Sequence, residues 1–382
     1  MSTTSIPASR AEERRPVPAI VVPSEAKRSI KRQVSARNGN RFYLSPPTSH
    51  LHLPPTFVSR FYLILAAGLL LWVTDASQAA AQELDSLVSM DIRLSQFWAV
   101  TGYEQALVDT ILRRLPGGER DRAGNARVTL GSGVAKRLVV CPLDEPGYVV
   151  GGVREDGYLT LRRVGGGGSP LFDQQLEGNR VWIQGRRKLV PGVVAVRSIH
   201  LTRGRTAPSE APFTVDDAYV DVGADSPAEV AALGVEVLAP VTLPKLVHGY
   251  GTGLLAAPVI GRRTACAALL RAARKWGRGT NLPQAVMIAF VVEQELSQRG
   301  LGTLANTSGP FDETLIVDGR SGPRGKLLQG PDSETSTRWP GLGSVTRWSL
   351  PVSYEGTAVE TISLGDADDL RQALGAWIGG RQ

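Results

Sequence analysis

The residues best placed to do chemistry lie at positions 289–300, where an apolar run ends in a polar turn. The run AFVV does not alternate, which is typical of a parallel strand covered on both faces. The turn that follows brings Glu293, Gln294 and Glu295 in succession, and ligands of open α/β sheets bind just past such strand ends. Two adjacent carboxylates there are costly unless they bind metal or share a proton, so a Glu-Glu pair would indicate hydrolytic chemistry. The amide of Gln294 interrupts that pair.

The charge of the chain does not indicate a nucleic-acid partner. The net charge of the 382 residues is +7, but residues 1–60 contain ten Lys or Arg against three Glu and account for all of it. The rest of the chain is neutral, whereas nucleic-acid binding requires a basic face on the folded part. The length is sufficient for one large domain or two smaller ones with a substantial core.

The N-terminal part predicts export. Residues 1–60 are rich in Pro, Ser and Arg and are predicted to be a disordered basic extension. Residues 61–81 form a signal-peptide pattern, in which the apolar run FYLILAAGLLLWV follows Arg60 and an Ala-rich site predicts cleavage after Ala81. The run is shorter than the roughly 20 residues of a spanning helix. An uncleaved signal anchor is the alternative to an exported, periplasmic or extracellular, protein.

The order of the predicted elements describes an α/β domain that is split by a β module. Residues 82–163 carry helical periodicity, then a buried strand at 137–141 and a hairpin at 148–164. Short strands separated by turns occupy residues 164–249 and predict a small β-barrel. Residues 250–382 then contain a helix at 264–276, strands at 285–292 and 315–318, a loop at 319–343, a last strand at 344–351, and a C-terminal helix at 366–378 with Asp366 as N-cap.

Several motifs in this order resemble those of the dinuclear-metal aminopeptidases of family forty-two, which include glutamyl, deblocking and tetrahedral aminopeptidases. CPLDEPGY at 141–148 is similar to the family's AHxDEIGF, and IGRRTACAALL at 260–270 is similar to LDDRxGxA. The segments at 218–235, 289–300 and 350–360 extend the resemblance to nearly the whole chain after Leu84. It implies an α/β fold of the zinc-peptidase (phosphorylase/hydrolase) type, a mixed sheet flanked by helices with an inserted β-barrel.

The resemblance also implies where two metal ions would lie, and three ligand positions have lost their donors. The family's first His, bridging Asp and last His fall on Pro142, Gly261 and Gly356. Zinc or cobalt needs His nitrogen or carboxylate oxygen there, and these residues carry neither. The four histidines do not replace them, because two precede the apolar run and two lie in the inserted module and its exit: His50, His52, His200 and His248.

The remaining positions of the implied centre are only partly retained. The general base falls on Gln294, which accepts no proton at neutral pH, so a rate contribution of ~10²–10⁴ would be lost. Glu295 and Asp318 stay as carboxylates that could hold a weak single ion, and Asp144 has no imidazole left to orient. The alternative is that these four are ordinary polar residues at strand ends, with Asp144 paired to a local backbone donor.

Two arginines and two cysteines flank the implied centre. Arg262 and Arg263 adjoin the position of the bridging Asp, so we expect them to neutralise the nearby carboxylates as a salt cluster in place of the metals. Cys141 and Cys266 are the only cysteines, and two interpretations stay open for them. They are separate buried thiols, or a disulfide that links the strand to the helix, which export permits. A catalytic thiol has no nearby His to activate it.

The sequence therefore predicts an exported protein with an aminopeptidase fold and without peptidase catalysis. We expect it to bind peptides in the substrate cleft, or to act as a scaffold in a homo-oligomer or a mixed oligomer with active relatives. No cofactor and no nucleic acid is expected. The alternative is an active metal-dependent aminopeptidase with a rebuilt or single-metal site, which would require zinc or cobalt. Fold alone does not decide between them.

Overall fold

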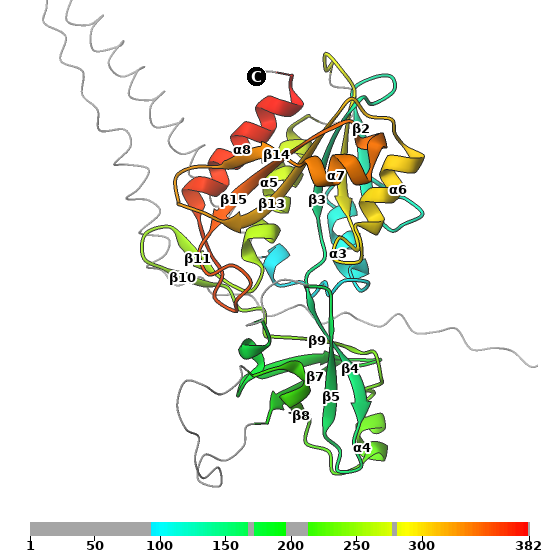
Figure 1. The fold of residues 1–382 in the computed structure, drawn as a ribbon, viewed down its shortest axis with the longest axis vertical. Helices are drawn as coiled ribbons and strands as arrows, with labels where there is room; N and C mark the ends of the chain where they lie inside the picture. Colours follow the sequence, from blue (N-terminus) through cyan, green and yellow to red (C-terminus); the bar gives the residue numbers. More distant parts are fainter. Residues whose placement is uncertain (1–92, 167–171, 196–212, 277–280, 381–382) are drawn as a thin grey trace, which may run out of the picture.

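The computed structural model describes residues 93–166, 172–195, 213–276 and 281–380 as two lobes (Figure 1). The larger lobe is an α/β domain and the smaller lobe is a closed β-barrel inserted into it. The expected basic extension and signal peptide, residues 1–60 and 61–81, lie outside the described residues. Within the described ranges, no helix combines the length and apolarity needed to cross a membrane.

A seven-stranded mixed sheet forms the centre of the α/β domain. Its four inner strands are parallel, and antiparallel strands complete both edges. In spatial order the strands are β1 (Glu119–Arg120), β2 (Ala126–Leu130), β12 (Val286–Val291), β3 (Arg137–Pro142), β13 (Glu313–Ser321), β15 (Ser344–Val352) and β14 (Leu328–Pro331). Every residue of β12 is buried, as expected for a parallel strand covered on both faces.

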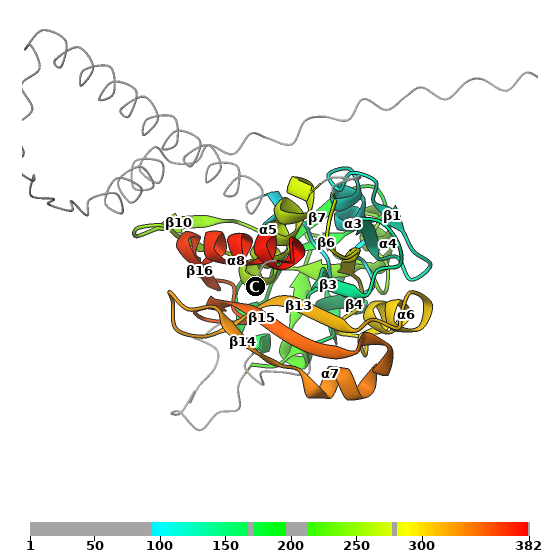
Figure 2. The ribbon, with the colours of Figure 1, turned by 90° about the horizontal axis from the view of Figure 1, so that it is seen from above.

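Helices cover both faces of this sheet (Figure 2). One face packs against α3 (Gln105–Leu112), α5 (Ile260–Trp276) and α8 (Leu364–Ile378). The other face packs against α6 (Arg299–Thr307) and the short helix η3 (Pro340–Leu342), and α7 (Ser333–Arg338) precedes η3. Because side chains alternate along a strand, β12 and β3 each contribute to both cores. A three-stranded sheet of β10 (His248–Tyr250), β11 (Leu254–Ala256) and β16 (Thr361–Ser363) lies beside them.

The inserted lobe is a six-stranded barrel with its own apolar core. Its strands are β4 (Gly147–Val153), β5 (Leu159–Val164), β8 (Tyr219–Asp221), β7 (Leu189–Val194), β6 (Arg180–Gln184) and β9 (Pro240–Thr242), with the helices η1 (Phe172–Leu176), η2 (Val215–Asp217) and α4 (Pro227–Ala232). The barrel therefore begins at β4, whereas the sequence suggested that it begins at residue 164. The hairpin of β4 and β5 pairs with β9 and β8, so it belongs to the barrel.

Three details of the α/β domain differ from the sequence prediction. Residues 319–343 are not only a loop, because they contain β14, held by pairing with β15, and α7. Strand β15 is not the last one, since β16 follows it. Asp366 lies in the first turn of α8 and accepts a hydrogen bond from the Gly325 N–H, whereas Ser363 is the N-cap.

Candidate functional site

The predicted site residues meet in a cavity between the two lobes, which we call the cleft. It opens where the carboxyl ends of the parallel strands approach the barrel, and its volume is about 480 Å³. Arg262 enters it from the first turn of α5, Glu295 from the turn after β12, and Asp318 from the second half of β13. Three barrel-side residues form an apolar part of the opposite wall: Tyr148, Phe172 and Leu243.

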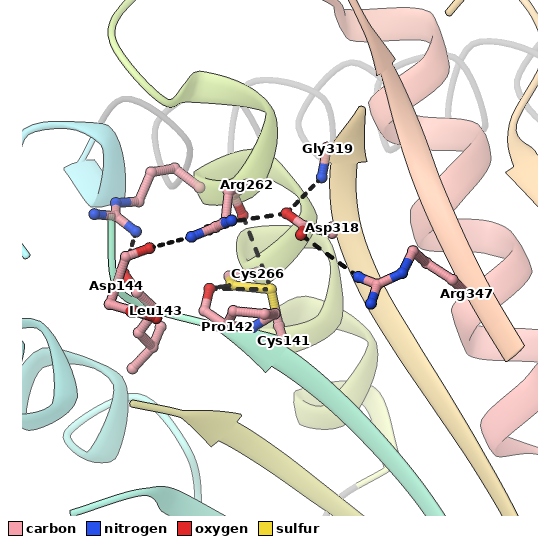
Figure 3. Close-up of a disulfide and its surroundings, with 10 residues drawn as sticks. Cys141, Pro142, Leu143, Asp144, Arg262, Cys266, Asp318, Gly319 and Arg347 are labelled. Atoms are coloured by element: carbon pink, nitrogen blue, oxygen red, sulfur yellow. Dashed lines mark hydrogen bonds and ion pairs between the residues drawn. A yellow bond between two sulfur atoms is a disulfide. The ribbon is translucent and has the colours of Figure 1, made fainter. Parts of the chain in front are cut away.

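The guanidinium of Arg262 joins Glu295 and Asp318, which we call the site carboxylates. Its Nη1 lies 3.1 Å from Glu295 Oε1, and its Nε lies 3.2 Å from Asp318 Oδ1. Figure 3 shows the same side chain donating to the Asp144 carbonyl oxygen, at 2.6 Å, and Arg347 approaching Asp318 from the other side, at 3.6 Å. The predicted ion pairs are confirmed for Arg262. Burial lowers its pKa, but the carboxylates outweigh burial and raise the pKa above its usual value, so the cation persists.

Arg263 does not join this cluster, which corrects the expectation for the second arginine. It donates to the Leu143 carbonyl oxygen and pairs with Glu145 at 2.9 Å. Consecutive helical residues point about 100° apart, so two neighbours cannot both face the site carboxylates. Glu145 is 1% exposed and also pairs with Lys245 at 2.8 Å. Burial raises the pKa of Glu145, but the two cations outweigh it and hold the pKa below its usual value.

The position of the implied bridging Asp has no room for a side chain. A Cβ on Gly261 would overlap Val352 Cγ1 and lie 3.3 Å from the Gly319 Cα. The first turn of α5 therefore packs directly against the end of β13. The carboxylate of Glu360 caps this turn, accepting from the Gly261 N–H at 2.8 Å and from the Gly356 N–H at 3.0 Å. Burial raises the pKa of Glu360.

The other expected site residues are placed as follows. Gln294 is half-buried and is absent from the described residues that line the cleft. Asp144 Oδ2 accepts the Glu295 N–H at 2.8 Å, so it positions the turn after β12, as the local-pairing alternative proposed. Gly356 lies at φ +73° with open space around it, a backbone conformation that disfavours a histidine. Pro142 ends β3, paired with Val291.

The two cysteines form a disulfide. The bond joins Cys141 of β3 to Cys266 of α5, and both residues are fully buried (Figure 3). The interpretation as separate thiols is therefore wrong, and neither sulfur is available as a nucleophile. The bond fixes the helix that carries Arg262 to the strand that leads to Asp144.

The residues present do not fit a dinuclear metal centre. Across the described ranges, no group of three or more His, Cys, Asp or Glu side chains has an arrangement that could hold a metal ion. His248 lies on β10, where it stacks on Tyr250, and the other histidines lie outside the described residues. Arg262 presents a cation to the two carboxylates that a metal would need.

Comparison with known proteins gives the family. The model of the M42 glutamyl aminopeptidase family matches residues 124–324. The chain belongs to the M42 family. SgcX and FrvX, proposed aminopeptidases of Escherichia coli (strain K12), are 28% and 25% identical to this M42 chain over 215 and 232 residues. The alignments cover 54% and 59% of the chain and 56% and 62% of the relatives, so the chain spans less than two thirds of either.

Solved structures show the same fold. The TET1 peptidase of Pyrococcus horikoshii has a TM-score of 0.67 at 21% identity, over 76% of the M42 chain and 99% of that protein. The aminopeptidase APDkam598 of the archaeon Desulfurococcus kamchatkensis has a TM-score of 0.64 at 19% identity, over 78% and 95%. The predicted class, a mixed sheet flanked by helices with an inserted barrel, is confirmed.

Four residues of the M42 site were not singled out from the sequence. Two of them, Glu145 and Glu360, lie inside motifs that carried the resemblance, so an acidic residue three or four positions after an implied ligand was an available signal. Lys245 and Arg347 had no such signal, because only the tertiary fold brings the exit of the barrel and the middle of β15 to the cleft.

A buried acid behind the turn after β12 gives a pH-dependent prediction. Glu104 is 1% exposed, and its Oε1 accepts the N–H groups of Gly102 and Glu293 at 2.9 and 3.0 Å. Burial raises its pKa to about 6. The fold therefore favours the protonated form of Glu104. The resulting contribution to the free energy of unfolding is complete below pH 4.5 and is lost as the pH rises through 6.

The expected result is a weaker pH dependence of stability in Glu104→Gln, which keeps the Oε1 acceptor and removes the charge. Between pH 4.5 and 7.5 the wild-type free energy of unfolding should fall by up to about 2 kcal/mol relative to the variant. Urea denaturation at several pH values measures this difference. Parallel pH profiles for the two proteins would contradict it.

Proposed function

We propose that this M42 protein is exported and binds peptides in the cleft without hydrolysing them. The observation that carries the proposal is Arg262, whose guanidinium joins Glu295 and Asp318 where the family resemblance puts the metals. Gln294, in the position of the general base, has an amide that accepts no proton from water at neutral pH. The cleft volume of about 480 Å³ suits a small ligand or one end of a peptide.

The loss of hydrolysis predicts a specific result for metal loading. Purified protein incubated with zinc, cobalt or manganese should retain no stoichiometric metal and should release no amino acid from peptide substrates. Gln294→Glu should stay inactive, because it restores the base but none of the three missing ligands. Metal content by mass spectrometry and an aminopeptidase assay check both. Two metals per chain together with activity would establish the active-enzyme alternative instead.

Peptide binding needs its own test, because an inactive enzyme need not bind anything. A library of short peptides with a fluorescent label at the carboxyl end should contain members that bind the wild-type protein. Leu243→Trp, which places a larger side chain in the cleft wall, should weaken that binding about tenfold or more by taking up space that the peptide needs. Val237→Trp, at an exposed position outside the cleft lining, is the matched control. Binding that survives Leu243→Trp would place the peptide elsewhere.

A scaffold role is the second candidate. The TET1 peptidase can assemble into a tetrahedron or a large octahedral shell, and this likeness supports self-association of the present chain or assembly with active relatives. Light scattering coupled to size-exclusion chromatography tests it, and a monomer at all concentrations would exclude it. Export rests on the pattern of residues 61–81, and an N-terminus at Gln82 in the secreted protein would support it.

A further inference from the structure

A second cavity lies at the opposite end of the α/β domain, and we call it the tryptophan cavity. Its volume is about 860 Å³. It is formed where β3 and β13 begin and α8 ends, whereas the cleft lies where those strands end. Figure 1 shows the end of α8 pointing away from the barrel. The residues of this cavity play no part in the peptide site, so an activity assigned to it is independent of the proposed function.

The guanidinium of Arg137 is held in a fixed orientation in this cavity, and some of its N–H donors have no partner among the described residues. Arg137 Nε donates to Glu313 Oε2 at 3.1 Å, and its guanidinium carbon lies 3.8 Å from the ring centroid of Trp377. Trp377 Nε1 in turn donates to Glu313 Oε1 at 3.3 Å. These contacts fix the plane of the guanidinium. Its two terminal amino groups make no hydrogen bond to any described residue, so four N–H donors in a fixed fork line the cavity.

The charges of the described lining residues disfavour two ligand classes. Arg137 and Glu313 neutralise each other, which leaves the exposed carboxylate of Asp312 as the surplus charge among the described residues of the lining. An anionic ligand would be repelled by that surplus. A cationic ligand would meet the two terminal amino groups of Arg137, which line the cavity and would repel it. A neutral ligand remains.

The rest of the lining defines the shape of that ligand. Trp348 and Leu315 supply apolar surface, and Gln284 and Thr346 add neutral hydrogen-bonding groups. A pyranose ring has an apolar face formed by its C–H groups and a rim of hydroxyls that both donate and accept. Its C–H face suits an indole, and its vicinal hydroxyls suit planar forks such as guanidinium and carboxylate. We propose that the tryptophan cavity binds a neutral saccharide. The ring packs on Trp348, and its hydroxyls bond to Arg137 and Glu313.

The test uses the full chain and neutral trisaccharides: maltotriose, cellotriose, mannotriose and triacetylchitotriose. Calorimetry and tryptophan fluorescence should detect binding of at least one of them. Trp348→Ala should weaken it about tenfold, which corresponds to the loss of one aromatic contact. Arg137→Lys, which keeps the charge but not the fork, should weaken it similarly. Trp182→Ala, in the barrel, is the matched control and should bind as the wild type does.

Each outcome decides the proposal. Binding that is weakened about tenfold or more in both cavity variants and unchanged in the control supports it. No binding of any of the four sugars to wild type overturns it, as does binding that both cavity variants retain. Tighter binding of glucose 6-phosphate than of glucose would overturn the charge argument. Thermal denaturation of each variant shows whether it is folded, and Arg137→Lys keeps a test available if Trp348→Ala does not fold.

Discussion

Replacing Arg262 with alanine is expected to destabilise the protein by about 3–5 kcal/mol, the usual effect of removing one partner from a buried ion pair. The side chains of Glu295 and Asp318 are 19% and 10% exposed, so without the guanidinium two largely buried carboxylates would lie side by side, with Arg347 as the remaining cation next to Asp318. Urea denaturation at neutral pH measures the change. Arg162→Ala is the control, since Arg162 is 73% exposed and lies 3.8 Å from Asp216; its effect should be close to zero.

A charge-neutral variant separates electrostatics from packing in the same cluster. Arg262→Met combined with Glu295→Gln and Asp318→Asn leaves no uncompensated charge, and whole buried ion clusters can be replaced at little cost. The triple variant should therefore recover most of the stability lost in Arg262→Ala. If the triple variant were as unstable as the single one, or if Arg262→Ala cost under about 1 kcal/mol, the cluster would not hold the site together as described.

Removing the disulfide is expected to cost about 2–5 kcal/mol of stability. Cys141 and Cys266 are 125 residues apart in sequence, and the entire barrel lies in the loop that they close. The bond therefore restricts a large part of the unfolded chain, and long loops give the largest effects in the chain-entropy description. The double variant Cys141→Ala/Cys266→Ala should show the loss in thermal and urea denaturation.

The effect of reductant provides the control for this prediction. Both sulfurs are fully buried, so reductant should not reduce the bond in the folded wild type. Once denaturation exposes the bond, the reductant can cleave it, and the measured stability should then fall. The double variant should not respond to reductant at all. Equal stability of wild type and double variant would show that the bond contributes nothing to the fold.

Strong local patterns made the framework of the fold predictable from the sequence. The unbroken apolar run of β12 and the polar turn after it appear as expected. A strand that is buried on both faces needs apolar side chains at nearly every position, so its sequence is easy to recognise. Elements without such a pattern were missed. Strand β14 alternates only between exposed and half-buried residues and includes Gly330 and Pro331, so its pairing with β15, not its own composition, makes it a strand.

The candidate site was predictable to the extent that its charges follow from sequence neighbours. Arg262 was expected beside Glu295 and Asp318, and the ion pairs form. The different direction of Arg263 depends on helix geometry, and its partner Glu145 is shared with Lys245 across 100 residues. No local signal gives such a contact. The disulfide was also undecided from sequence, because pairing depends on the distance between a strand end and a helix turn.

The close approach of Gly261 to Gly319 has a consequence for how this protein can evolve. A Cβ on Gly319 would lie 2.7 Å from the Gly261 carbonyl carbon, so neither position accepts a side chain unless α5 moves away from β13. A substitution that introduces a carboxylate at 261 must therefore lower stability before it can help to bind anything, and other ligands would still be missing. Introducing a carboxylate at position 261 is therefore expected to cost stability on its own. Substitutions at cleft residues that do not lie in this contact, such as Leu243 and Gln175, face no such steric barrier. What the cleft recognises can therefore change more readily than the packing of α5 against β13.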